Sequence, residues 1–462
     1  MSMAQIDRGE ILAPQRNAAV SMSEAKLPWV VSLYLFCVLL PIGFQVGPLA
    51  MNTLRVLVLI ATVPLMTGVL LGRYGRIFAV DWLFALHILW AGVALFVNSP
   101  DRALEQVGSV GVEFLGGYAI GRAYIRDRAT FILLCKRLAL LICLALPFAL
   151  FETLTGRPHV LEALRKIPMV QTVTIAHQEP RLGLQRVQFT FSHPIHFGLF
   201  CSIVMSLTFV GLKGVISDNR RWLMTLVVGL CGFLALSSGA LLAIILQLGF
   251  FAWAAAFASI KQRWWLLFWL LVVAYIIVDI GSNRTPLMVA LEHLTFSAHN
   301  AYWRTIIFEW GIANVFGSAE KGIVGSPLFG LGLNDWVRPS FMHSGSMDNF
   351  WLVVAVSYGV PGFLLIAAGY VSVLAAMMRL KIEDTAMALC RRAWVFTFLG
   401  ISFTLCTVHI WGNLYSFFAF IFASGMWMLT APKLASGNVE EAPIEDVQIR
   451  SPPHYTRFPS RI

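Results

Sequence analysis

Residues 281–351 read GSNRTPLMVALEHLTFSAHNAYWRTIIFEWGIANVFGSAEKGIVGSPLFGLGLNDWVRPSFMHSGSMDNFW and form a long polar interruption between two strongly apolar segments. Within this stretch, Trp303, Ile306, Ile307 and Trp310 follow the i, i+3, i+4, i+7 spacing of a helix with one apolar face. We therefore predict a helix over residues 300–315 that lies along a membrane surface. A loop of this length is either functional or disordered, and its aromatic content favours an ordered, functional loop.

The composition excludes a soluble globular protein. Of the 462 residues, 58% are hydrophobic and 13% are charged, and the mean hydropathy is +0.75. The net charge of +10 comes from basic residues placed between apolar runs, a pattern of membrane topology rather than of nucleic-acid binding. The seven cysteines lie in or beside apolar runs without a CxxC pair, so neither a disulfide nor a thiolate metal site is expected.

The apolar runs predict an all-α polytopic membrane protein with about twelve transmembrane helices, because about 20 apolar residues cross the hydrocarbon core. The predicted spans are 29–49, 54–71, 80–97, 107–121, 131–151, 192–211, 222–236, 239–259, 264–280, 348–376, 393–411 and 413–431. They divide the chain into an N-terminal tail (1–28), a first transmembrane bundle (29–151), a loop (152–191), central helices (192–280), a large loop (281–347), C-terminal helices (348–431) and a disordered tail (432–462).

Lysine and arginine set the predicted orientation. With the N-terminus inside, the internal loops hold sixteen of these residues, and the short external loops hold only Arg55 and Arg102. The positive-inside rule then places both termini in the cytoplasm and the two long loops on the external face. The first 27 residues are polar and end without the apolar region of a cleaved signal, so the first span is expected to direct insertion.

The external loops nevertheless carry basic residues, which the topology rule disfavours and which an anionic substrate explains. We select Arg181, Arg186, Arg304 and Arg338 as candidates that bind the diphosphate of a lipid-linked substrate. The planar fork of arginine holds two phosphate oxygens at once. The alternative for Arg181 and Arg186 is contact with lipid headgroups.

His193 and His196 lie three residues apart and share one face if a helix begins near Ser192. A metal pair is one interpretation, but no further ligands complete a set, and we expect no metal. We favour capping by Ser192, with supporting packing or hydrogen-bonding roles for the two histidines. His87 and His409 lie alone in predicted spans and are interpreted as satisfied interior groups.

His343 and Asp348 are the candidate proton acceptors, since a hydroxyl that attacks a sugar carbon needs a base within reach. The alternative for Asp348 and Asn349 is an N-cap pair for the following span, and because capping alone explains an aspartate there, we favour His343. Asp335 is the expected partner of Arg338 in a structural clamp. Glu113 is an intramembrane carboxylate, for which a functional role and a structural pair both stay open.

The order of several short motifs resembles the O-antigen ligase and bacterial polysaccharide polymerase family over residues 30–430. The motifs are Arg181-Leu-Gly with Ser192-His-Pro, Ser237-Ser-Gly-Ala, Trp303-Arg, Ser326-Pro-Leu-Phe-Gly-Leu-Gly, Asp348-Asn-Phe-Trp-Leu and Tyr358-Gly-Val-Pro-Gly. The chain has no arginine in the Ser238-Gly239 helix opening, where ligases tend to have Ser-Arg-Gly, and it has Asp348-Asn349 where ligases have His-Asn. The Asp-Asn form looks more like exopolysaccharide polymerases.

The resemblance implies a fold related to membrane glycosyltransferases of the C type and an undecaprenyl-diphosphate-linked glycan as donor, without a metal or other cofactor. Our leading hypothesis is a polymerase that joins lipid-linked repeat units on the periplasmic face of a bacterial inner membrane. Its expected partners are the lipid bilayer, a flippase, and chain-length or export proteins. The alternatives are an O-antigen ligase, whose acceptor is lipid A core, and a polysaccharide flippase.

Overall fold

The computed structural model describes residues 26–46, 49–282, 289 and 298–431, so the predicted tails lie mostly outside the described residues. Within this part of the chain, eight helices are long and apolar enough to cross a membrane, and two shorter apolar helices accompany them. The chain is therefore an all-α membrane protein, as its composition predicts.

The elements follow one another in this order. They are α2 (Trp29–Leu39), β1 (Gly43–Val46), β2 (Leu49–Asn52), α3 (Thr53–Leu70), α4 (Ala79–Asn98), α5 (Pro100–Tyr124), α6 (Arg128–Thr155), α7 (His159–Arg165), α8 (Pro194–Phe209), α9 (Asp218–Leu234), α10 (Ser238–Ala256), α11 (Arg263–Gly281), α13 (Ala298–Phe316), α14 (Phe350–Arg379), α15 (Thr385–Leu405), α16 (Gly412–Ser424) and the 3-10 helix η1 (Met426–Leu429).

The first predicted span is wrong in its second half. Helix α2 ends at Leu39, and strands β1 and β2 form an antiparallel hairpin in which Gly43 pairs with Asn52. Pro41 explains the early end, because a proline disfavours helical geometry in the residue before it and supplies no N–H of its own. Asn52 then caps α3 by accepting the Arg55 N–H at 2.8 Å.

Helix α5 is longer than predicted, and its glycines make it a packing centre between α3 and α16. A Cβ at Gly116 would lie 2.6 Å from Val58 of α3, and one at Gly117 would lie 2.3 Å from the Ser416 carbonyl oxygen of α16. Small residues let membrane helices approach closely in this way. The same helix carries Glu113, whose carboxylate accepts a 2.7 Å bond from the Arg55 Nε.

Helix α14 is broken at Gly359, which has φ 73°. The breaker-rich turn 326–332 fills the break: Leu331 N–H donates to the Val356 carbonyl at 2.7 Å, and Val360 N–H donates to the Pro327 carbonyl at 2.7 Å. Backbone groups freed inside a membrane protein need such partners. The turn therefore anchors the large loop to α14.

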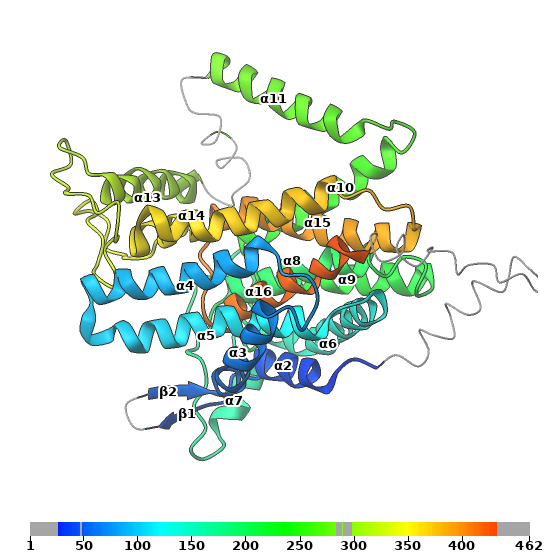
Figure 1. The fold of residues 1–462 in the computed structure, drawn as a ribbon, viewed down its shortest axis with the longest axis horizontal. Helices are drawn as coiled ribbons and strands as arrows, with labels where there is room; N and C mark the ends of the chain where they lie inside the picture. The colour runs from blue at the N-terminus through cyan, green and yellow to red at the C-terminus, as the bar shows by residue number, and fades with distance from the viewer. Residues whose placement is uncertain (1–25, 47–48, 283–288, 290–297, 432–462) are drawn as a thin grey trace, which may run out of the picture.

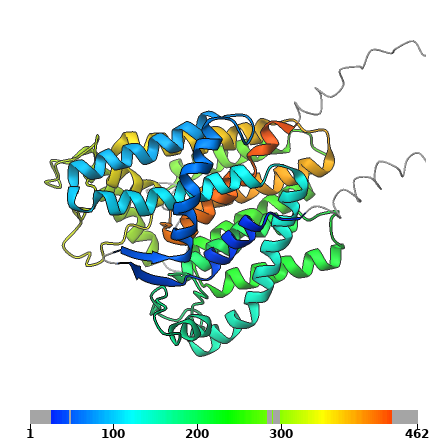
Figure 2. The ribbon, with the colours of Figure 1, turned by 60° about the horizontal axis from the view of Figure 1, so that its bottom comes forward.

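Figures 1 and 2 show the helices running between two ends of the molecule. The hairpin, α13 and residues 317–349 lie at one end, and the described chain begins and finishes at the other. Helices α4, α5 and α14 lie side by side, whereas α11 stands apart in Figure 1 and has no buried residue. Residues 317–349 of the large loop therefore lie opposite the two ends of the described chain.

Candidate functional site

The segment between α7 and α8 presents two arginines beside the connection between α9 and α10. Arg181 and Leu184 exchange backbone hydrogen bonds of 3.0 and 2.9 Å around a tight turn in which Gly183 has φ 75°. The Arg181 Nη1 donates to the Leu236 carbonyl at 2.8 Å, and the Arg186 Nε lies 3.5 Å from the Ala235 carbonyl oxygen. Carbonyl oxygens at the end of α9 therefore position both guanidinium groups.

The two arginines form a partly desolvated cationic pair. Burial, together with the smaller effect of the positive charge of Arg181, lowers the pKa of Arg186 to about 10. Burial also lowers the pKa of Arg181. Among the described residues, no carboxylate forms an ion pair with Arg186, whose Nη1 donates instead to the Gln178 Oε1 at 3.0 Å. An anion placed here would stabilise the charged form of both groups.

His193 lies next to this pair and caps α8. Its Nδ1 accepts the Ile195 N–H at 3.1 Å, so His193, and not the predicted Ser192, is the N-cap, because the helix begins two residues later than expected. Ser192 instead hydrogen bonds to His196 Nδ1 at 3.2 Å. Burial and then the charges of Arg186 and Arg181 lower the pKa of His193 to about 4. His193 is therefore neutral near pH 7.

Arg304 of α13 interacts with charges both in the segment between α7 and α8 and directly before α14. It lies half-buried on α13, and burial lowers its pKa. The negative charge of Asp348 opposes that shift, and the positive charge of Arg181 adds to it. The charges on α13, directly before α14 and in the segment before α8 are therefore close enough to act on one another.

The apolar stripe of α13 packs inside the protein, which accounts for it without a membrane surface. Ile307 belongs to a buried cluster with Trp336 and Met342 of the large loop and Leu352 of α14. Gly311 permits the close approach, since a Cβ there would lie 2.4 Å from Leu352. The predicted helix exists, and its packing fixes the backbone that carries Arg304.

Asp348 and Asn349 have separate environments at the start of α14. Asn349 is the N-cap, and its side chain accepts the Leu352 N–H at 3.0 Å. Asp348 does not cap the helix; its half-buried carboxylate accepts a 2.9 Å bond from the Ser346 hydroxyl. His343 is exposed on the loop. Capping therefore does not explain the aspartate at position 348.

Asp335 and Arg338 form the predicted clamp. The Arg338 Nη1 donates to both carboxylate oxygens of Asp335 at 2.7 Å, and its Nε donates to the Met342 carbonyl at 3.1 Å. These bonds hold the returning part of the large loop. Arg338 thus has a carboxylate partner, whereas Arg186 forms no ion pair with a carboxylate in the described part of the chain.

Trp411, which the sequence analysis did not select, joins the site from the connection between α15 and α16. Its ring centroid lies 3.9 Å from that of His196 and 6.3 Å from that of His193, and the side chain is 42% exposed. His409 stacks between Trp411 and Phe350 with centroids 5.7 and 6.1 Å away. The sequence feature that could have indicated Trp411 is the aromatic pair His409-Ile-Trp411 directly before Gly412, a helix breaker.

The sequence interpretation of His87 and His409 as satisfied interior groups holds for His87 but not for His409. His87 is a satisfied interior group, with its Nδ1 2.8 Å from the Gly362 carbonyl oxygen. His409 lies outside the helices, and its Nδ1 is buried without a hydrogen-bond partner in the described part of the chain. Among the described residues, no group of three histidine, cysteine or acidic side chains is placed to hold a metal ion.

Comparison with known proteins gives no assignment. No protein-family model matches the chain, and no curated protein matches its sequence. The function is therefore argued from the residues of the site.

Proposed function

We propose that this protein is a membrane glycosyltransferase that polymerises lipid-diphosphate-linked oligosaccharide units on the external face of the membrane. The observation that carries the proposal is a series of charge interactions: Arg186 interacts with Arg181, and Arg304 interacts with both Arg181 and Asp348. Three interacting cations, one of which also interacts with a carboxylate, match a reaction in which a diphosphate leaves and a hydroxyl loses its proton.

The arginines would bind the diphosphate of the donor. A bidentate guanidinium matches the geometry of two phosphate oxygens, and such charge-assisted bonds are stronger where water is partly excluded. In the transition state, charge develops on the leaving diphosphate, and positioned cations stabilise it without an acid that protonates the leaving group. Arg186 and Arg304, which burial disfavours as cations, gain most from that anion.

Asp348 would act as the base, in place of the exposed His343. The acceptor hydroxyl oxygen forms a bond to the anomeric carbon while the bond from that carbon to the diphosphate oxygen breaks. The lipid diphosphate keeps the electron pair, and the hydroxyl proton passes to Asp348. The position of Asp348 beside Arg304 supports this role, because the base then lies next to the bound leaving group.

Two further features support a glycan substrate and the polymerase form. Trp411 offers an exposed aromatic face beside His193, suited to the apolar face of a sugar ring. The helix opening at Ser238 lacks the arginine of the ligases that the chain resembles, but Arg181 and Arg186 bond or approach the carbonyl groups directly before that helix. The Asp348-Asn349 motif favours a polymerase over a ligase.

The test is polymer formation by the purified protein in liposomes that contain lipid-linked repeat units. We expect Asp348→Asn to lower the rate by about a hundredfold or more, the usual contribution of a positioned base, and His343→Ala to retain most of it. Wild-type activity of Asp348→Asn with loss in His343→Ala would return the role to His343. Transfer of the glycan to lipid A core, without polymer, would identify a ligase. Movement of intact repeats across the bilayer, without transfer, would identify a flippase.

A further inference from the structure

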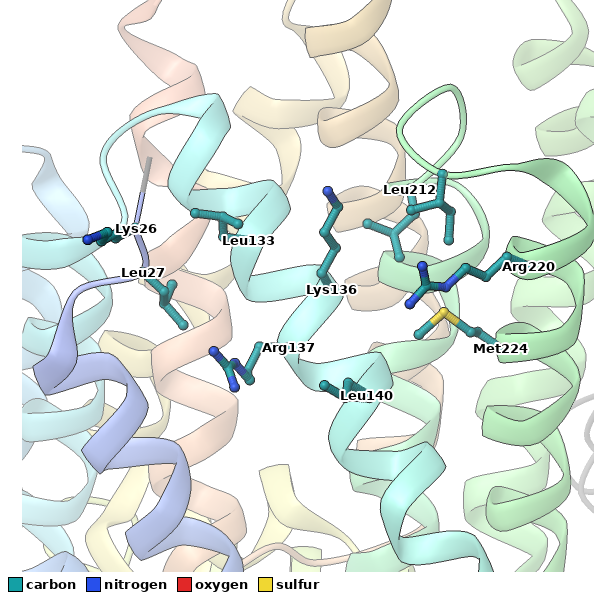
Figure 3. A pocket seen from close by; sticks show the side chains of 10 residues that line it. Lys26, Leu27, Leu133, Lys136, Arg137, Leu140, Leu212, Arg220 and Met224 are labelled. Atoms are coloured by element: carbon teal, nitrogen blue, oxygen red, sulfur yellow. The ribbon is translucent and has the colours of Figure 1, made fainter. Parts of the chain in front are cut away.

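A second candidate binding site lies at the end of the bundle opposite the arginine cluster. A cavity of about 590 Å³ is bounded by the approach to α2, by α6, by the connection between α8 and α9, and by α9. Four basic side chains line it: Lys26, Lys136, Arg137 and Arg220. Figure 3 shows Arg220 extending from α9 toward α6, which carries Lys136 and Arg137.

The cavity has no negative charge to balance these cations. None of its lining residues is acidic. Asp218, the acidic residue at the start of α9, already pairs with Arg221 at 2.9 Å. Within the described part of the chain, none of the four lining cations forms an ion pair or a side-chain hydrogen bond. Like charges around one cavity repel each other, and a bound anion would relieve that repulsion.

The other walls of the cavity are apolar. Leu27, Leu133, Leu140, Leu212, Ile216 and Met224 complete the lining. Leu140 is 42% exposed on the surface of the membrane helix α6, so the cavity adjoins the lipid phase. A small soluble anion would leave these walls without a partner. A ligand with an anionic head and apolar chains contacts both parts.

We propose that this cavity binds one anionic phospholipid of the leaflet at this end of the bundle. The four cations hold the headgroup phosphate, and the acyl chains lie along Leu140 and Met224. Basic pockets between transmembrane helices bind anionic headgroups in this manner, and the cavity has room for the headgroup and the first part of the acyl chains, whose remainder extends into the lipid phase. The site is separate from the proposed glycosyl-transfer site and does not depend on it.

The test is lipid retention by the full-length protein in detergent, measured by native mass spectrometry. Phosphatidylglycerol and phosphatidylcholine with identical acyl chains are added to the delipidated protein. We expect one molecule of phosphatidylglycerol to be retained in preference to phosphatidylcholine. The double variant Lys136→Gln, Arg220→Gln should bind it about tenfold more weakly, because each cation near an anionic headgroup contributes to binding.

The matched control is the double variant Arg73→Gln, Arg126→Gln, which removes the same charge from exposed positions at the same end of the bundle, outside the cavity. It should retain phosphatidylglycerol like the wild type. Leu140→Trp keeps all four cations but places a larger side chain at the apolar wall, so it should weaken lipid binding. This variant tests the proposal independently if the charge variant does not fold. Equal retention of the two lipids, equal behaviour of the two double variants, or displacement of the lipid by an equal concentration of inorganic phosphate would overturn the proposal.

Discussion

At the residue scale, the adjacent residues Asp348 and Asn349 are both typical N-cap residues, but they have different environments. Asn349 accepts the Leu352 N–H and caps α14, whereas the Asp348 carboxylate faces Ser346 and the charge of Arg304. The pattern Asp-Asn before an apolar run predicts a cap, and one of the two residues is that cap. Which of the two caps depends on where the helix begins, and sequence places helix ends less securely than helices.

The cap predicts a stability effect that is separate from activity. Asn349→Ala should lower the free energy of unfolding by about 1 kcal/mol, the usual cost of a lost N-cap, because the Leu352 N–H loses its acceptor. Asp348→Ala should leave the thermal midpoint of the purified protein close to that of the wild type. A larger loss of stability in Asp348→Ala than in Asn349→Ala would show that Asn349 is not the residue that caps α14.

His193 predicts a pH effect on stability. Its pKa in the folded protein is about 4, below the ordinary value of 6.5, so the unfolded chain binds a proton more readily than the folded protein. Stability is thus fully present above pH 6.5 and is lost as the pH falls toward about 4. His193→Asn keeps a cap acceptor and removes the titration, so its thermal midpoint should fall less over this range. An unchanged pH dependence in this variant would contradict the assignment.

At the scale of elements, the sequence predicts most helices but not how their interruptions are used. Hydropathy places α3, α4, α6 and α10 within a few residues of their observed bounds. It misses the hairpin of β1 and β2, because a strand of four residues has no periodic signal long enough to distinguish it from a helix end. The glycines and proline of residues 326–332 are typical of a turn, but nothing in the sequence relates that turn to the break in α14.

The junction between that turn and α14 depends on Gly359. A Cβ at this position would lie 2.1 Å from the Leu328 carbonyl oxygen, and the residue has φ 73°. Gly359→Ala should therefore lower the free energy of unfolding by more than about 2 kcal/mol, through backbone strain and overpacking. Thermal unfolding followed by tryptophan fluorescence measures the change.

Gly249→Ala is the control for this substitution. Gly249 lies exposed within α10, and a Cβ there would meet nothing within 4 Å. An alanine in this helix should leave stability unchanged or raise it by up to about 1 kcal/mol. Similar midpoints for the Gly359 and Gly249 variants would show that the turn does not hold α14 in its broken form.

At the scale of the whole molecule, the distribution of basic residues predicts the orientation in the membrane, whereas only the tertiary structure relates distant residues of the candidate site. The basic residues of the short loops predict which end faces the cytoplasm, and both views place the two ends of the described chain together, opposite the long loops. The convergence of Arg304 with Arg181 was not predictable in this way. These residues belong to segments separated by four helices of the described chain, and no periodicity relates positions so far apart.

The orientation predicts the outcome of a topology experiment. A reporter fused after Gly317 should be external, and one fused after Lys381 should be internal, because the internal loops hold sixteen lysines and arginines against two in the short external loops. Paired alkaline phosphatase and fluorescent protein fusions report the two sides. An internal signal after Gly317 would show that the orientation is the reverse of the predicted one, and it would contradict the use of a glycan donor on the external face.

The central claim is that Arg181, Arg186 and Arg304 bind one lipid diphosphate. The most direct measurement is the affinity of the purified protein for undecaprenyl diphosphate. Each single alanine variant should bind about tenfold to a hundredfold more weakly, since a charge-assisted bond is lost, and lysine should restore little because it lacks the planar fork. Arg102→Ala, an exposed arginine at the same end of the bundle, should bind like the wild type. Binding by Arg304→Ala that equals binding by Arg102→Ala would contradict the claim that two distant segments form one diphosphate site.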